Sequence, residues 1–387
     1  MTTRPPSGRQ DVQLPRGLVL TAGWAWRLLV ILAAAAAVVF ALRAASIVVV
    51  PLAVAVLLAA LLAAPTRVLA DHTPLRRSGA ALIVLLLAVL LISGLAGLAG
   101  TQLASGAGTM RDSAEQGLAE IEDWLRTGPL NLTTEQLSDY MSKATEALRN
   151  NRSALTTGLL TGATTAGHFI AGLLIALIAT FFFLAEGERI WRFFVRLLPA
   201  EARERTYEAS RRGWVSLGHY ARTQVLVAGV DAIGIGVGAL ALRLPFVVPL
   251  TLLVFLSSFI PIVGAVFSGA VAVLIALVVK GPGTALIMLA IVLAVQQLET
   301  HVLQPFLMGR AVALHPLAVI IAVALGSYLL GIVGALFAVP VLAFCNSTVR
   351  YWTGDDPVPA LGTADLPTFE EDEEAEPARS PRGPAEG

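Results

Sequence analysis

The feature that most constrains this chain is a series of apolar runs long enough to cross a lipid bilayer. Several uninterrupted runs exceed about 18 residues, the length that spans the hydrocarbon core of a membrane as a helix. Of the 387 residues, 56% are hydrophobic and only 14% are charged, whereas a soluble domain carries roughly 25% charged residues. The sequence therefore predicts an all-α polytopic membrane protein embedded in a lipid bilayer.

The apolar runs and the polar stretches between them divide the first half of the chain into three parts. We predict a disordered, basic arm over 1–23, membrane helices 1 to 3 over 24–104, and a helical extracytoplasmic insertion over 105–165. The insertion is polar, and we expect two amphipathic helices there, joined at Gly128–Pro129.

The second half is expected to hold the rest of the membrane region. Membrane helices 4 to 8 are predicted within 166–350; an arginine-rich cytoplasmic amphipathic segment lies among them over 186–212, and a span follows it over about 217–242. Residues 351–387 are acidic and proline-rich, which predicts a disordered tail. The expected fold has about eight transmembrane helices and a small helical insertion outside the membrane.

Two of the apolar stretches, 245–280 and 312–348, contain prolines and glycines that favour broken or re-entrant helices. The sequence Ile-Val-Gly-Ala-Val-Phe over 262–267 recurs as Ile-Val-Gly-Ala-Leu-Phe over 332–337. Paired, interrupted segments point to the binding site in repeat-built transporters; the alternative is a chance match among common residues. The residues predicted to break helices or to gate are Pro261, Gly264, Pro305, Gly331, Gly334 and Pro340.

Arginine residues set the expected orientation. The basic arm, the link over 65–78 and the segment over 186–212 fall on one side of the membrane if the first four spans alternate. Cytoplasmic loops carry an excess of Lys and Arg, so we expect the N-terminus and, after eight crossings, the C-terminus in the cytoplasm. The strong bias toward arginine over lysine is typical of bacteria with GC-rich genomes, and the predicted location is a bacterial inner membrane.

The patterns that most enzymes and metal sites need are missing. Cys345 is the single cysteine, so an internal disulfide and a thiolate metal site are excluded. The sequence contains no nucleophile elbow, zinc-ligand pair or phosphate-binding loop. We therefore expect no enzyme, no metal site and no nucleic-acid partner, and no cofactor beyond a coupling ion, which would be a proton or sodium.

A cluster of polar side chains ends the apolar run that leads to residue 304. At about 100° per residue these side chains share a helical arc of about 200°, so they line a pathway, form a buried polar network, or mark an ordinary helix end at the membrane surface. Arg310, a little further on, either pairs with Glu299 or marks the membrane boundary. The predicted substrate- or ion-binding residues here are Gln296, Gln297, Glu299, His301, Gln304 and Arg310.

Asp231 lies near the middle of its predicted span. An Asp at mid-membrane costs about 2.5–3.5 kcal/mol on insertion scales, so we predict either an ion- or proton-coupling carboxylate or a neutral, hydrogen-bonded structural residue. Arg222 and Gln224, one to three turns earlier, are its possible partners. The glycines at 234, 236 and 238 indicate close packing against a neighbouring helix.

Several of these segments together resemble a known family. Residues 259–264, 296–299, 302–305 and 308–316 closely resemble signature segments of the autoinducer-2 exporter (AI-2E) family of bacterial membrane proteins. Residues 331–340 resemble its C-terminal motif, and 184–189 with 197–199 are similar to its central cytoplasmic region. The resemblance covers about 24–350.

The resemblance implies eight membrane helices, a hydrophilic region after the third, homo-oligomers, and export of small polar molecules such as the quorum-sensing signal autoinducer-2. Some family members are described as sodium(lithium)/proton antiporters. The family often has Gly-Asn where this chain has Thr300-His301, and Asp231 matches no family hallmark, so the resemblance does not fix the substrate. The family's Glu, Gln and Pro positions carry over to Glu299, Gln297, Gln304, Pro305, Pro261 and Pro316.

Three functions remain open from the sequence. The first is a secondary transporter that exports a small polar solute by alternating access, with Glu299 binding a cation or a substrate hydroxyl. The second is a cation/proton antiporter in which Asp231 and Glu299 titrate. The third is a membrane scaffold whose insertion and acidic tail recruit partners. The expected partners are a small polar solute or cation, the lipid bilayer and further copies of the chain.

Overall fold

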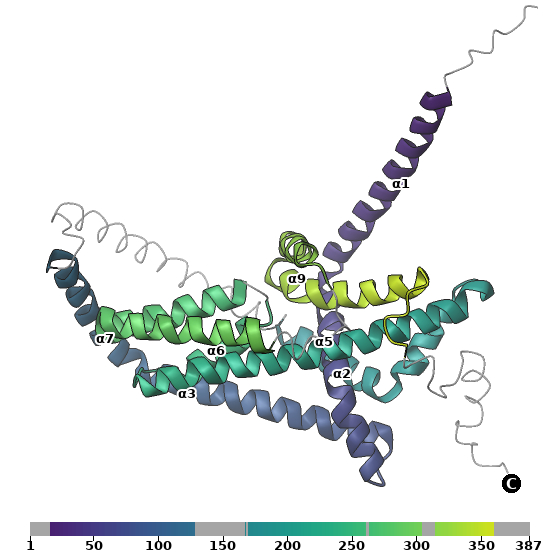
Figure 1. The fold of residues 1–387 in the computed structure, drawn as a ribbon. Helices are drawn as coiled ribbons and strands as arrows, with labels where there is room; N and C mark the ends of the chain where they lie inside the picture. Colours follow the sequence, from purple (N-terminus) through teal and green to yellow (C-terminus); the bar gives the residue numbers. More distant parts are fainter. Residues whose placement is uncertain (1–15, 128–166, 168, 261–262, 304–313, 360–387) are drawn as a thin grey trace, which may run out of the picture. The chain divides into compact units, whose positions relative to one another are not determined.

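The computed structural model describes residues 16–127, 167, 169–260, 263–303 and 314–359, and every regular element among them is a helix (Figure 1). Seven helices in these ranges are long and apolar enough to cross a membrane. The predicted all-α, polytopic fold is therefore confirmed, while the number of crossings stays a prediction. The chain divides into two compact units, Met1–Val49 and Val50–Gly387.

The first unit contains α1, Arg16–Ala44. The arm predicted to be disordered over 1–23 is thus helical from Arg16 onward, because the apolar residues over 18–20 continue the pattern of the membrane run. Trp24 and Trp26 are exposed, and the Arg27 guanidinium lies 5.8 Å from the Trp24 ring centroid. Aromatic and basic side chains of this kind anchor helices at a membrane surface.

The boundary between the two units falls within the first turn of α2, Ser46–His72, and the second unit continues with α3, Arg77–Thr127. No break marks the predicted start of the insertion at 105, because no proline follows in α3 to stop the helix. At 1.5 Å per residue, α3 is about 77 Å long, far longer than the hydrocarbon core of about 30 Å, so it extends well outside a bilayer. The predicted junction at Gly128–Pro129 lies outside the described residues.

The arginine-rich stretch belongs to two helices rather than to one surface segment. The helix over Phe169–Arg196 ends just before Pro199, and α5 then runs unbroken over Ala200–Ala241. The structure therefore divides this region at Pro199 and not after residue 212. The predicted segment 186–212 covers the end of one helix and the start of α5, and the predicted span 217–242 lies almost wholly within α5. The physical reason is the placement of proline: Pro199 ends one helix, and the next proline is residue 245.

The remaining helices contain sharp changes of direction. Helix α6, Val247–Ser257, is followed by α7, Val263–Leu298, which is interrupted at Gly281 with φ 75°. The π-helix η1, Glu299–Leu303, continues α7, and α9, Pro316–Trp352, is interrupted at Leu330 and Gly331. A positive φ is a conformation that glycine adopts without strain, which explains why these two long helices change direction at glycines.

Small residues hold α5, α6 and α7 close together. Five of the twelve buried residues in the core between them are alanines, and Ile235, Val254 and Met288 are among the larger side chains there. A Cβ added at Gly238 would lie 2.7 Å from Ile291, and one at Gly234 would lie 2.8 Å from Val295. The close packing predicted from the alternating glycines is confirmed, and it brings the carboxyl-terminal half of α5 directly against its neighbours.

Candidate functional site

Asp231 is buried in the middle of the α5 packing surface. Its residue is 2% exposed, and it lies ten residues before the end of α5 at Ala241. At 1.5 Å per residue that distance is about 15 Å, half of a hydrocarbon core of about 30 Å. The helices packed around Asp231 therefore shield its carboxyl group from solvent.

The groups nearest to Asp231 come from α6. Ser258 caps the carboxyl end of α6, and its Oγ lies 3.2 Å from Asp231 Oδ2. Gln224, about two turns before Asp231 on α5, donates from Nε2 to the Ser258 carbonyl oxygen at 2.7 Å. No described residue bonds the other carboxyl oxygen, Oδ1. Of the two partners offered by the sequence, Gln224 therefore acts through Ser258, and Arg222 does not bond Asp231.

The π-helix η1 begins at Glu299 and contacts both α5 and α7. Glu299 is half-buried and is close enough to Asp231 for the two carboxyl groups to interact electrostatically. Isolated π-helical turns are rare and occur frequently at functional sites. The proline at 305 has no N–H to offer the preceding turn, which is a physical reason for the α-helical pattern to end here.

The predicted polar arc of α7 and η1 is only partly turned toward α5. Gln296 is half-buried like Glu299, whereas Gln297 and His301 are exposed. The His301 ring Nδ1 lies 3.2 Å from the Gln297 carbonyl oxygen, within its own helix. The structure thus brings Glu299 toward Asp231 but not His301. Four further predicted residues lie outside the described residues: Gln304, Arg310, Pro261 and Pro305.

The two members of the internal repeat have the same local form. In each, a glycine lies against backbone that precedes a change of chain direction. Gly264 lies against Ser257 at the end of α6, and Gly334 lies against Gly326 on the other side of the interruption in α9. A side chain at either glycine would collide with that backbone. The break in α9 is at Gly331, as predicted. Gly264 and Gly334 themselves lie inside helices.

Pro340 was also predicted to break a helix, but α9 continues through it. Membrane helices tolerate proline where neighbouring groups compensate for the missing N–H, and Pro340 is buried against its surroundings.

Sequence reasoning missed Ser258, although a signal was present. Two adjacent serines, Ser257 and Ser258, end an apolar run just before Pro261. Serine is common where a helix stops, because its hydroxyl bonds nearby backbone groups. Their nearness to Asp231 depends on how α6 packs against α5, which local sequence does not specify.

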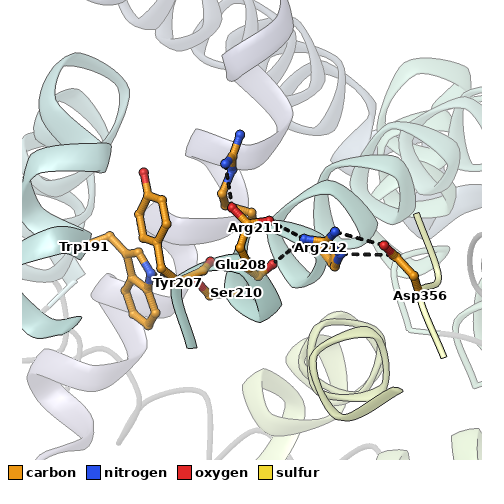
Figure 2. Close-up of polar contacts among 7 residues, drawn as sticks. All are labelled: Trp191, Tyr207, Glu208, Ser210, Arg211, Arg212 and Asp356. Carbon is orange, nitrogen blue, oxygen red and sulfur yellow. Dashed lines mark hydrogen bonds and ion pairs between the residues drawn. The ribbon is translucent and has the colours of Figure 1, made fainter. Parts of the chain in front are cut away.

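A second buried charge lies on the amino-terminal half of α5, and four of its five N–H donors have acceptors (Figure 2). The Arg212 side chain is 3% exposed and forms two hydrogen bonds to Asp356, Nε to Oδ1 at 3.0 Å and Nη2 to Oδ2 at 2.9 Å. Its remaining nitrogen bonds the Glu208 carboxylate and carbonyl oxygen. The guanidinium also lies 3.9 Å from the Tyr351 ring centroid. We refer to Arg212, Glu208, Asp356 and Tyr351 as the Arg212 network.

The Arg212 network joins α5 to the end of α9 and to the segment after it. Ser216 and Ser347 share a buried hydrogen bond of 2.6 Å, and Arg205 donates to the Trp352 carbonyl oxygen at 2.8 Å. The bidentate contact with Arg212 lowers the pKa of Asp356 below its ordinary value. These contacts indicate that the Arg212 network stabilises the packing of α5 against the end of α9.

We refer to Asp231, Ser258, Gln224 and Glu299 as the Asp231 cluster. Its chemistry differs from that of the Arg212 network, because it concentrates negative charge and acceptor groups. The Asp231 carboxyl group interacts electrostatically with that of Glu299, and the carboxyl end of α6 adds the partial negative charge of a helix C-terminus. Such a site attracts a cation or a proton. Among the described residues no group of three His, Cys, Asp or Glu side chains could hold a metal ion.

Comparison with known proteins identifies the family. Residues 28–354 match the AI-2E family transporter. The chain belongs to the AI-2E transporter family. MT0215 of Mycobacterium tuberculosis, named as a candidate transport protein, is 42% identical over 337 residues, which are 87% of this chain and 92% of MT0215. The AI-2 transport protein TqsA of Escherichia coli is 24% identical over 280 residues, 72% of this chain and 78% of TqsA.

Membership of the AI-2E family confirms the resemblance drawn from the signature segments. It assigns the chain to multi-pass membrane transporters, and the seven long apolar helices agree with that assignment. The match covers every helix of the Asp231 cluster and of the Arg212 network as far as Gly354. Asp356 lies two residues beyond it.

Proposed function

We propose that this chain is a secondary transporter of the bacterial inner membrane that moves a small polar solute outward by alternating access. A solute of the autoinducer-2 type is the first to test, because TqsA is named for AI-2 transport and shares 24% identity with this chain. The observation that carries the proposal is the buried Asp231, which has one oxygen bonded by no described residue and interacts electrostatically with Glu299.

The geometry supports different roles for Asp231 and for the pair Glu299 and Gln296. Glu299 and Gln296 are half-buried and so remain open to a ligand, whereas Asp231 is enclosed between helices. An enclosed carboxyl group is suited to bind a coupling ion. Half-buried carboxylate and amide groups are suited to hydrogen-bond a hydroxylated solute.

A second candidate, a cation/proton antiporter, is favoured by the same pair of carboxyl groups. Two acids facing each other beside a helix C-terminus repel each other when both are ionised, and a bound cation or proton relieves that repulsion. In this version Asp231 and Glu299 both titrate during the cycle, and no organic solute is needed.

Flux measurements in proteoliposomes test the proposal. The purified chain would be reconstituted with autoinducer-2 inside the vesicles, and efflux would be followed under a proton or a sodium gradient. Glu299→Gln and Asp231→Asn should abolish gradient-driven efflux. Glu201→Gln and Asp71→Asn are the matched controls, because these acids are exposed and lie outside the Asp231 cluster; both controls should keep the flux of the wild type.

Ion exchange without solute movement would favour the antiporter. Absence of any flux from folded protein would overturn the proposal. A deletion of 360–387 separates transport from scaffolding, since a transporter keeps its flux and a scaffold loses its function. The cut is placed after residue 359 because Asp356 is part of the Arg212 network.

A further inference from the structure

The Ser258 hydroxyl faces two acceptors but has a single hydrogen. Its Oγ lies 2.9 Å from the Val254 carbonyl oxygen and 3.2 Å from Asp231 Oδ2. A serine hydroxyl donates one hydrogen bond and accepts through its lone pairs. With Asp231 ionised, the single hydrogen must be shared between the two acceptors or turn to one of them. If Asp231 carries a proton and donates it to Ser258 Oγ, both contacts are full hydrogen bonds at the same time.

This arrangement defines two states that differ by one proton. In the first, Asp231 Oδ2–H donates to Ser258 Oγ, and the serine hydrogen bonds the Val254 carbonyl. In the second, the proton has left Asp231 for water in the transport pathway, and the serine hydrogen turns to the carboxylate. The Val254 carbonyl still accepts from the Ser258 backbone N–H at 2.9 Å, so it remains bonded in both states.

We propose that Asp231 is the proton-coupling site of the transport cycle and that Ser258 is its positioning residue, whose hydroxyl turns between Val254 and Asp231 as the proton binds and leaves. The inference rests on the proposed transport function and names its coupling ion. Gln224 fixes the Ser258 carbonyl oxygen, so the change is confined to the hydroxyl. Ser258 ends α6, where the chain turns toward α7.

The ionisable groups on the helices that pack around Asp231 are few in the described part of the chain. Glu299 of η1 interacts with it and is acidic; His301 of η1 is exposed and lies against the Gln297 carbonyl oxygen. Helix α6 has no ionisable side chain, and the one ionisable residue of α7, Lys280, lies beside the turn at Gly281. On α5 the nearest cation is Arg222, nine residues earlier. An ionised Asp231 would be a buried charge without a cation beside it in the described part of the chain, which is costly.

Infrared difference spectroscopy of the purified protein in nanodiscs tests the inference without needing flux. The C=O stretch of a protonated carboxyl group should be present in the wild type at neutral pH and absent in Asp231→Asn. Ser258→Ala should shift that band, because the acid loses its acceptor. Ser268→Ala is the matched control: Ser268 is a buried serine that donates to a backbone carbonyl, Gly264 O at 2.8 Å, and no carboxyl group is among its partners. It should leave the band unchanged.

Flux provides the second readout. Ser258→Ala should change the pH profile of transport and lower its maximum about tenfold, the factor expected for one lost hydrogen bond of ordinary strength. Ser268→Ala should keep the profile, and Ser258→Thr, which retains the hydroxyl, should restore it. The inference is overturned if the band is missing at neutral pH, if Asp231→Asn leaves it in place, or if the two serine variants behave alike. A band that behaves as expected in a protein without flux would instead reject the transport function alone.

Discussion

Two buried ionisable residues on one helix, Arg212 and Asp231, have opposite surroundings. They lie nineteen residues apart on α5, about 28 Å at 1.5 Å per residue. Arg212 bonds two carboxylates and an aromatic ring and has donors directed at acceptors on every side. Among the described residues, the Asp231 side chain has one hydrogen-bond partner, Ser258, and an oxygen that no described residue bonds.

The comparison distinguishes Arg212, a charge with a structural role, from Asp231, an acid whose surroundings allow its protonation state to change. A buried charge that is fully paired is stable as long as its partners remain, and it has no reason to change its protonation state. A buried acid with an oxygen that lacks a hydrogen-bond partner changes its bonding when a proton or cation binds to it. The Arg212 network should therefore determine whether α5 and α9 stay together, while the Asp231 cluster should determine whether the protein transports.

Loss of Arg212 should produce the largest change in stability. Arg212→Ala leaves Asp356 without its buried partner, while Glu208 keeps its ion pair with Arg211. Breaking a buried ion pair from one side costs about 3–5 kcal/mol. We expect the lower end of that range, because Asp356 keeps 30% exposure. The free energy of unfolding in detergent micelles measures the effect.

Arg350→Ala is the control for that prediction. Arg350 pairs with the largely exposed Asp355 at 2.7 Å, and exposed ion pairs contribute about 0–1 kcal/mol. If both arginine variants lose the same stability, Arg212 is no more than a surface charge and the comparison fails.

A smaller, pH-dependent effect should follow from Asp356. The Arg212 guanidinium lowers the pKa of this carboxyl group below its ordinary value of 3.8, so its ionised form is stabilised in the folded state. That contribution is complete above 3.8 and is lost as the pH falls below this value through the lowered pKa. Asp356→Asn should cost about 1 kcal/mol of unfolding free energy at pH 7, and the deficit should shrink at pH 3.

Asp355→Asn is the matched control for Asp356→Asn. Asp355 is 63% exposed, and its loss should change stability by less than about 0.5 kcal/mol at either pH. A deficit for Asp356→Asn that stays the same from pH 7 to pH 3 would show that charge is not what holds the segment after α9.

The sequence was sufficient for those features that depend on local pattern. Apolar runs located the spans because a helix that crosses lipid must be apolar over its length. The glycines at 234, 236 and 238 predicted close packing, and Gly331 predicted a break in α9; both predictions are confirmed. Asp231 stood out because its side chain is expensive inside such a run.

The partners of the buried charges could not be predicted, because they come from distant parts of the chain. Ser258 reaches Asp231 only through the packing of α6 on α5, and Asp356 meets Arg212 across 144 positions. Composition also placed a boundary after 212, whereas α5 continues through it, since a change from charged to apolar residues does not end a helix unless a proline or a capping group does.

The smallest expected change in stability is also the most informative, because its sign depends on the resting state of Asp231. If the acid is protonated, Asp231→Asn replaces an O–H donor by an N–H donor of the same shape toward Ser258, and stability should change by less than about 0.5 kcal/mol. If the acid is ionised at rest, the same substitution removes an uncompensated buried charge and should raise stability by several kcal/mol. The unfolding free energy at pH 7 distinguishes the two, and Asp71→Asn, at an exposed acid of α2, sets the baseline. A marked gain in stability would mean that the Asp231 carboxyl group is ionised at rest. The site would then bind a cation in place of a proton.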